Sequence, residues 1–224
     1  MKNIHLIWDF DGTLVDSGKD VFESLDAAVQ REGLSKTDQV ADYKLGPTID
    51  KILDISFPPD VLSQGKKEAI IKRFRQIYDN CDFKNTVPFV GIEKIINDNK
   101  FIHHILTNKP DLVTKKIIFK LNWAGVFSSV VTPYSFLKEK EPLKNKRELF
   151  AFLKKEYLND ILIGIGDMPT DCLAAKTNGL IAIGVLWGTG TKNELEESGC
   201  DIIVESPDNL YNYLLSQYKK IHIS

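Results

Sequence analysis

The chain has 224 residues, of which 43% are hydrophobic and 27% charged, and its formal net charge at pH 7 is −2. These values are typical of a globular protein with one large core, or with a core and a small inserted domain. Because charges of both signs are scattered and no apolar run approaches the roughly 18 residues of a membrane span, we expect a cytoplasmic protein that binds neither nucleic acid nor a membrane.

The first predicted element is a buried strand at residues 4–10, and the segment after it breaks the pattern of strands. Residues 16–84 contain three helical patterns and no convincing strand; the patterns lie at 19–32, 47–55 and 59–78. Pro47 suits the first turn of the second helix because its φ is fixed and it lacks a donor. A helical segment of this length between two strands of a sheet indicates an inserted cap domain, which leaves residues 1–15 and 85–224 as the core.

Short apolar, β-branched runs alternate with helical patterns through the rest of the chain. Five further strands are predicted at residues 101–106, 126–132, 161–165, 181–186 and 202–204. The helical patterns lie at residues 111–121, 147–157, 170–177 and 209–220. Strands and helices that alternate in this way predict an α/β fold, with a parallel sheet covered on both faces.

Two aspartates stand at the end of the first predicted strand, in the sequence Asp9-Phe10-Asp11-Gly12-Thr13. Residues two apart in a strand point to the same side, so both carboxylates leave the sheet together. They would repel each other unless a divalent cation lay between them, and oxygen ligands of this kind suit Mg²⁺. Gly12 allows a sharp turn and a close approach of the backbone to a ligand. The pattern therefore favours a metal site over a simple turn.

A second group of polar residues, Thr107-Asn108-Lys109-Pro110, directly follows the strand predicted at 101–106. A hydroxyl and backbone N–H groups at a strand end that leads into a helix can hold an anionic oxygen. A capping threonine followed by a turn explains the same residues equally well. The sequence leaves both interpretations open.

A third group is the sequence from Gly164 to Asp171, at the end of another buried strand. Asp167 closes this apolar strand, and an acid in such a position needs a cation or a hydrogen-bond donor. Asp171 lies four residues later, on the first turn of the next helix, where it is either functional or only a capping residue. Ligands of open α/β sheets bind at the carboxyl ends of the strands, so these groups together predict a magnesium and phosphate site.

The three cysteines, Cys81, Cys172 and Cys200, lie far apart in the chain and show no Cys-x-x-Cys spacing. This spacing argues against a disulfide framework and against a zinc site. We expect thiols in a reducing cytosol.

The chain resembles the haloacid dehalogenase superfamily. The resemblance rests on four motifs in order: DFDGT at 9–13, LTNK at 106–109, a lysine at about 140–146, and GDMPTD at 166–171. The segments DGTLVDSGKDVFESL, VPFVGIEKII and GVLWGTGTKNELEESGCDIIVESPDNL resemble the phosphoglycolate phosphatase-like branch. The resemblance implies a Rossmann-like core, with a helical cap inserted after the first strand.

The lysine motif departs from the pattern of the branch, which usually reads Lys-Pro-x-Pro. Counted back from the helix predicted at 147–157, Lys144 fits the register best, and Lys146 fits a shorter Lys-x-Glu pattern. Lys140 fits less well. We narrowly favour Lys144 as the residue that contacts the phosphoryl group, with Lys146 as the alternative.

The resemblance also implies a role for each site residue. Asp9 would be the nucleophile that is transiently phosphorylated, and Asp11 the general acid and base. Mg²⁺ would be held by Asp9, the main-chain carbonyl of Asp11 and Asp167, with Asp171 supporting the metal or orienting the lysine. The phosphoryl oxygens would be bound by Thr107, Asn108 and a lysine.

The expected function is hydrolysis of a small phosphorylated metabolite, with phosphoglycolate as the default substrate. A phosphomutase shares every core residue and is the nearest alternative. A non-catalytic binding module is a weaker alternative, because such a copy should have lost Asp9, Asp11 or Asp167. The sequence names neither the substrate nor the oligomeric state, so monomer and homodimer both remain open.

Overall fold

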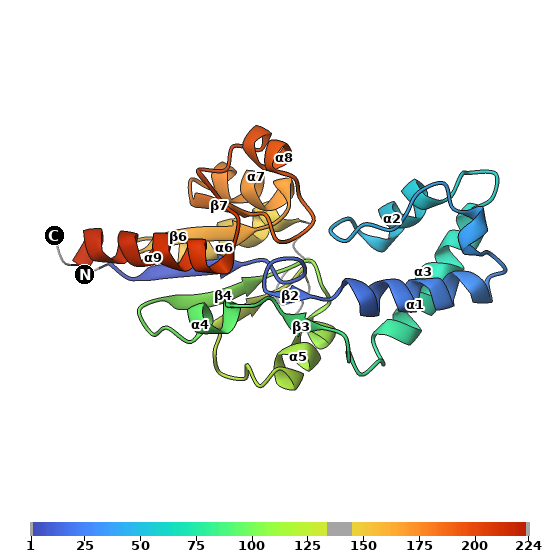
Figure 1. Ribbon diagram of the computed structural model, residues 1–224, viewed down its shortest axis with the longest axis horizontal. Coiled ribbons are helices and arrows are strands. Elements are labelled where there is room, and N and C mark those ends of the chain that lie inside the picture. The colour runs from blue at the N-terminus through green and yellow to red at the C-terminus, as the bar shows by residue number, and fades with distance from the viewer. Residues whose placement is uncertain (1, 134–144, 223–224) are drawn as a thin grey trace. The chain divides into compact units, whose positions relative to one another are not determined.

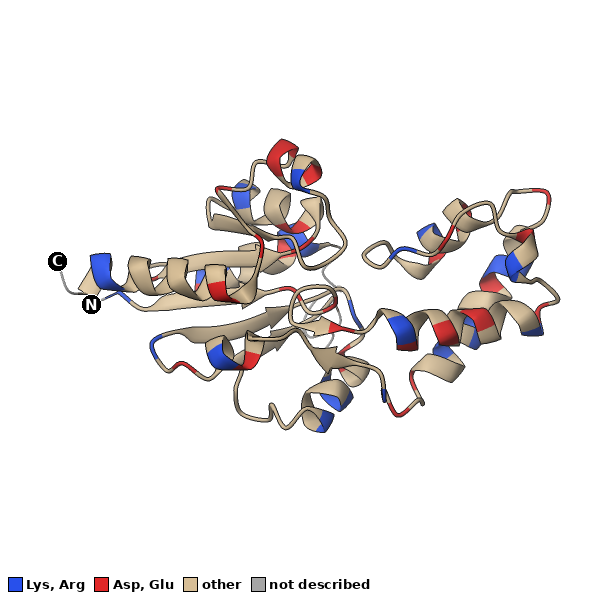
Figure 2. Cartoon of the chain, viewed as in Figure 1, with Lys and Arg blue, Asp and Glu red and all other residues tan. Residues whose placement is uncertain are grey.

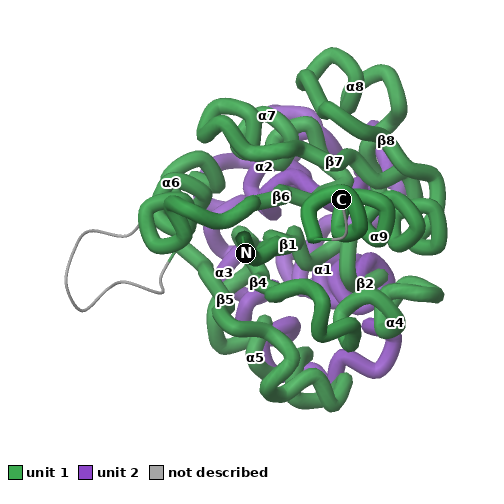
Figure 3. The backbone as a smooth tube through the Cα atoms, turned by 90° about the vertical axis from the view of Figure 1, so that its left-hand side faces the viewer, with its two compact units in different colours: residues 1–16, 88–224 green, residues 17–87 purple. Residues whose placement is uncertain are grey.

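The computed structural model describes residues 2–133 and 145–222 (Figure 1). The chain divides into two compact units, Met1–Asp16 with Pro88–Ser224, and Ser17–Val87 (Figure 3). Charged residues of both signs are spread over the helices and loops of both units (Figure 2). Among the described residues, the helices are too short or too polar to cross a bilayer.

The first unit is built on a parallel sheet of six strands in the order β5-β4-β1-β6-β7-β8. The strands are β1 (Ile4–Trp8), β4 (Ile102–Leu106), β5 (Ser129–Val131), β6 (Ile161–Gly166), β7 (Ile181–Val185) and β8 (Ile202–Val204). All six were predicted, and the α/β fold class is confirmed. Strand β1 is central and all five of its residues are buried, which explains why its sequence is apolar except for His5.

Helices cover this sheet. Helices α6 (Lys146–Glu156) and α7 (Pro169–Thr177) pack against each other, α6 also against β4, and α7 also against β6 and β7. Helix α9 (Pro207–His222) packs on β8 and on the short helix α4 (Ile92–Ile96), and α5 (Asp111–Lys120) follows β4. A cluster of buried apolar side chains joins the sheet to α6 and α7; it includes Ile7, Leu106, Leu149, Phe150, Leu153 and Ala175. Helices α4 and α8 (Lys192–Glu197) were not predicted.

The second unit is helical, with α1 (Gly18–Arg31), the 3₁₀ turn η1 (Lys36–Asp38), α2 (Ile49–Ser56) and α3 (Gln64–Tyr78). Two helix starts differ from the prediction. Helix α2 begins after Thr48, so Pro47 precedes the helix. Helix α3 begins after Ser63, whose side chain accepts a hydrogen bond from the Lys66 N–H, because the residues before it form a separate turn. Two short strands, β2 (Val15–Asp16) and β3 (Val87–Pro88), pair with each other where the chain passes between the units.

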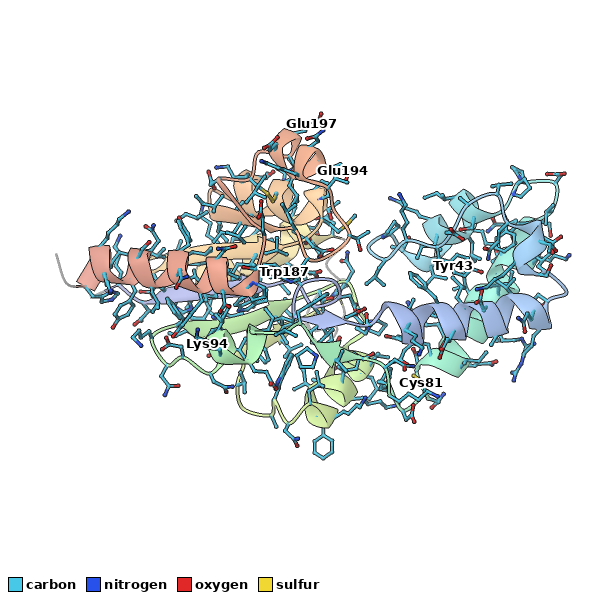
Figure 4. All side chains as sticks on the ribbon, viewed as in Figure 1. Tyr43, Cys81, Lys94, Trp187, Glu194 and Glu197 are labelled. Carbon is cyan, nitrogen blue, oxygen red and sulfur yellow. A yellow bond between two sulfur atoms is a disulfide. The ribbon has the colours of Figure 1, made fainter. Side chains whose placement is uncertain are left out.

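The expectation of unbonded thiols is wrong for two cysteines. Cys172 and Cys200 form a disulfide, with their Cα atoms 5.3 Å apart. Cys172 lies in α7 and Cys200 lies just before β8, so 28 positions of sequence separate them. The packing of α7 beside β7 and α8 brings them together, and sequence spacing alone carries no sign of that contact. Cys81 lies in the helical unit (Figure 4).

Candidate active site

Three loops at the carboxyl edge of the sheet carry the candidate site. Strand β1 lies between β4 and β6, so the residues that follow these strands leave the sheet side by side. The Asp9 N–H donates to the Ile165 carbonyl at 2.8 Å, and the Thr107 N–H donates to the Val131 carbonyl at 3.1 Å. Asp9, Thr107 and Asp167 are all buried. The parallel sheet thus collects polar side chains that are far apart in the sequence.

Three aspartates meet at this edge. Asp9, Asp167 and Asp171 each place a carboxylate oxygen within 4.8 Å of the others, and all three are buried. Asp171 is on the first turn of α7, where one of its oxygens accepts a hydrogen bond from the Met168 N–H at 3.1 Å. Asp171 therefore caps the start of α7, which is one of the two interpretations that the sequence left open, and its carboxylate also lies in the cluster.

Lys146 joins two of these aspartates. Its Nζ lies 2.6 Å from Asp9 Oδ1 and also contacts Asp171 Oδ1, and its side chain is only 9% exposed. Lys146 is the first residue of α6, which begins after Asn145, whose side-chain oxygen accepts a hydrogen bond from the Glu148 N–H at 3.1 Å. Lys144, which we favoured from the sequence, and Lys140 lie outside the described residues.

Burial makes these carboxylates resist ionisation. It raises the pKa of Asp9 to about 7, with a further rise from Asp171 and Asp11 that Lys146 opposes. Burial and then the Asp9 charge raise the pKa of Asp167 to about 6, and burial also raises the pKa of Asp171. Burial disfavours the charge of Lys146, but Asp171 and Asp9 outweigh it and raise its pKa. The cluster therefore holds more negative charge than one lysine offsets.

A second lysine pairs with Asp11. Lys109 Nζ lies 2.8 Å from Asp11 Oδ1 and 3.1 Å from Oδ2. The Lys109 N–H donates to Thr107 Oγ1 at 3.1 Å, so Thr107 does support the turn that was one of its two interpretations. Asn108 is exposed on the same loop. Sequence reasoning placed Lys109 in a motif but gave it no role, because Asp11 lies 98 positions away in the chain.

Asp167 is held by neighbours that sequence reasoning missed. Thr13 Oγ1 donates to Asp167 Oδ1 at 3.0 Å, and the Thr189 N–H donates to Oδ2 at 2.9 Å. The Trp187 indole N–H donates to the Thr13 carbonyl at 3.0 Å. Gly12 has a φ of +83°, and a Cβ at this position would lie 2.5 Å from Asp167 Oδ2. Only glycine fits there, because both the backbone angle and the space exclude a side chain.

The loop after β7 closes around the same aspartate. A Cβ on Gly188 or on Gly190 would collide with atoms of Asp167. The closely spaced glycines in the sequence Trp187-Gly188-Thr189-Gly190 were the available signal for this contact. They let the backbone of the loop approach Asp167 closely enough for a main-chain N–H to bind it.

The charge and donor set of the cluster fit a divalent cation. Among the described residues four carboxylates face two lysines at this edge: Asp9, Asp11, Asp167 and Asp171 with Lys109 and Lys146. When all six groups are charged, a dication would balance the remainder. Carboxylate oxygens are ligands that Mg²⁺ prefers, and because these carboxylates are buried, fewer water molecules compete with them for the cation. The residues present therefore fit Mg²⁺.

A family model described as haloacid dehalogenase-like hydrolase matches residues 6–185. The chain belongs to this family. The resemblance drawn from the motifs and the expectation of a hydrolytic enzyme are confirmed.

Three proteins illustrate what this haloacid dehalogenase-like chain is similar to. The phosphoglycolate phosphatase of Aquifex aeolicus is 27% identical over 188 residues, which cover 82% of this chain and 84% of that protein. A haloacid dehalogenase-like family hydrolase of Streptococcus pneumoniae has a TM-score of 0.79 at 19% identity, and the match covers 95% of this chain and 98% of that one. A Thermotoga maritima protein assigned as a β-phosphoglucomutase has a TM-score of 0.64 at 16% identity, with 96% and 99% covered. The two solved structures show the fold alone.

Proposed function

We propose that the protein is a Mg²⁺-dependent phosphatase that hydrolyses a small phosphomonoester through an aspartyl phosphate on Asp9. The observation that carries this proposal is the buried cluster in which Lys146 Nζ lies 2.6 Å from Asp9, with Asp167 and Asp171 beside it. Relatives named phosphoglycolate phosphatase make phosphoglycolate the default substrate. As the sequence implied, the substrate is a phosphorylated metabolite.

The reaction has two displacements. An oxygen of Asp9 attacks phosphorus in line, the bond from phosphorus to the substrate oxygen breaks, and Asp11 donates a proton to that oxygen. Asp11 then accepts a proton from water, whose oxygen attacks phosphorus and releases inorganic phosphate and the Asp9 carboxylate. Thr107, the backbone of Asn108 and a lysine hold the phosphoryl oxygens. We assign that lysine role to Lys146, and Lys144 remains the alternative.

The metal would be held by Asp9, the main-chain carbonyl of Asp11 and Asp167, with Asp171 supporting it and orienting Lys146. When bound, Mg²⁺ supplies the positive charge that lowers repulsion between a carboxylate nucleophile and a phosphate. Thr13 and the Thr189 N–H would keep Asp167 in place for this task.

We propose that the helical unit, Ser17–Val87, is a cap domain inserted in a catalytic core. We also propose that the protein acts in the cytoplasm, as a monomer or a homodimer.

A phosphomutase is the second candidate, because the β-phosphoglucomutase-like structure shares the fold. The two functions differ in which oxygen takes the phosphoryl group from Asp9, water or a second hydroxyl of a sugar. Release of inorganic phosphate from a sugar phosphate favours the phosphatase, and conversion to an isomeric sugar phosphate favours the mutase.

The test is phosphate release from a panel of phosphomonoesters and pyrophosphate, with Mg²⁺ and with a chelator. We expect chelator-sensitive turnover of one member, abolished by Asp9→Asn and retained by Asp208→Asn, a matched change at an exposed carboxylate. Full activity of pure Asp9→Asn protein would contradict the assignment of the nucleophile. If wild-type protein released no phosphate from any member, the phosphatase proposal would fail.

A further inference from the structure

The Lys109–Asp11 pair points to a role that the four motifs leave unassigned. We propose that Lys109 is a positioning residue, which aims the Asp11 carboxylate at the oxygen of the leaving group. This inference rests on the proposed function, in which Asp11 is the general acid and base. It gives a task to a lysine that is distinct from the one beside Asp9.

The Lys109 ammonium group contacts both carboxylate oxygens of Asp11. Lys109 Nζ lies 2.8 Å from one oxygen of Asp11 and 3.1 Å from the other. Contact with both oxygens limits rotation of the carboxyl group about its last bond. When one oxygen carries the proton that Asp11 donates in the first displacement, Lys109 keeps its hydrogen bond to the other oxygen, so that the protonated oxygen faces the leaving group. Charge-assisted hydrogen bonds of this length are also stronger than neutral ones.

Burial differs between the two partners. The Lys109 side chain is 5% exposed and the Asp11 side chain 22%. The ammonium group is thus shielded, while part of the carboxylate can be reached from outside. That arrangement suits a carboxylate that meets the substrate and a lysine that acts behind it.

The backbone fixes Lys109 independently of its side chain. Its N–H donates to Thr107 Oγ1 at 3.1 Å, and Pro110 has a fixed φ and restricts the backbone conformation of Lys109, the residue before it. The loop follows β4, which is hydrogen-bonded to β1, the strand that precedes Asp11. Two neighbouring strands therefore set the distance between the ammonium group and the carboxylate.

Lys109 also offsets the repulsion between Asp11 and the other carboxylates of the site. Asp11 stands two positions from Asp9, at an edge that also holds Asp167 and Asp171. Without a cation behind it, the Asp11 carboxylate would be repelled by the Asp9 carboxylate. Lys109 offsets this repulsion and keeps Asp11 in a single orientation.

The dependence of the rate on the leaving group separates positioning from direct binding of phosphate. An alkoxide needs a proton to leave, whereas p-nitrophenolate leaves without one. A lysine that binds the phosphoryl group would support both substrates equally, because that group is the same in both. A lysine that aims the general acid matters only where a proton is needed.

The experiment compares kcat/KM for p-nitrophenyl phosphate and for the alkyl phosphate that wild-type protein cleaves fastest. For each substrate, kcat/KM depends only on the steps up to formation of the aspartyl phosphate, so the rate of the later hydrolysis does not affect it. For Lys109→Met we expect a loss of about thirtyfold or more with the alkyl phosphate and at most about threefold with p-nitrophenyl phosphate. Lys115→Met, an exposed lysine on α5, should match wild type with both. The ratio of the two losses does not depend on the fraction of folded protein.

A double-mutant cycle completes the test. If Lys109 acts through Asp11, adding Lys109→Met to Asp11→Asn should cause little further loss of kcat/KM for the alkyl phosphate. Equal losses for both substrates, or additive losses in the double variant, would overturn the proposal. Should Lys109→Met not fold, the same comparisons are made with Lys109→Gln. Absence of turnover in wild-type protein would instead refute the proposed function, so the two failures are distinguishable.

Discussion

Removing the metal should make the stability of the protein fall as pH rises. The pKa is raised from 3.8 to about 7 at Asp9 and to about 6 at Asp167, in both cases mainly by burial. An acid with a raised pKa in the folded state stabilises the fold fully below its unfolded pKa, and this contribution is lost as pH rises through the folded pKa. Mg²⁺ requires ionised carboxylates, so its binding should remove the penalty at high pH.

The size of the effect follows from the two values. Each unit of pKa shift corresponds to about 1.4 kcal/mol. Between about pH 5.5 and about pH 8 the metal-free fold should lose on the order of 2 to 3 kcal/mol, most of it from Asp9. For a chain of this size 1 kcal/mol shifts Tm by roughly 2 to 4 °C, so the Tm difference between Mg²⁺ and chelator should widen by roughly 4 to 12 °C.

The assay is thermal unfolding with saturating Mg²⁺ or with chelator at both pH values. Asp167→Asn removes one carboxylate of the cluster, so the widening should shrink in this variant. Asp208→Asn lies at an exposed surface and should behave as wild type. A Tm difference that stays constant or narrows as pH rises would refute the reasoning, because the buried acids would then not be the groups that the metal ionises.

Three further predictions concern individual side chains. Lys146→Met leaves buried carboxylates unpaired and should cost about 3 to 5 kcal/mol of stability and about a hundredfold in kcat. Lys155→Met, at an exposed position on the same helix, should change both quantities little. Equal losses for the two variants in the unfolding and rate assays would contradict this prediction. Gly12→Ala and Gly33→Ala both place alanine at a positive φ, which should cost about 1 to 2 kcal/mol of stability in each variant. Only the Cβ at position 12 would clash with Asp167, so Gly12→Ala should lose more stability than Gly33→Ala and should also lose activity; equal losses in the two variants would refute the clash. Burial lowers the pKa of His103 to about 4, so the stability that the neutral imidazole provides is present above about pH 6.5 and is lost as pH falls toward 4. In urea unfolding of Mg²⁺-loaded protein, the free energy of unfolding should therefore fall by about 2 kcal/mol less on acidification to about pH 5 in His103→Asn than in wild type. The same pH dependence in both proteins would contradict this role of His103.

The sequence located the strands and two of the acids reliably. Apart from His5, the residues of β1 and β6 are apolar because both faces of a central parallel strand are covered, so Asp9 and Asp167 stand out as the first acids after these strands. The helix starts were less reliable, because caps and turns compete locally. The Asn145 cap, with Glu148 three residues later, was a readable signal that α6 begins at Lys146.

The sequence by itself determined the order of the strands along the chain, the helical insertion, and the presence of acids at strand ends, because each depends on patterns within a few residues. The tertiary structure alone decided which side chains meet. Lys109 and Asp11 are 98 positions apart, and Lys146 and Asp9 are 137 apart. Cys172 and Cys200 carry no pairing signal in their spacing. These contacts depend on the sheet order β4-β1-β6-β7, which places distant loops at one edge, and no local pattern encodes that order.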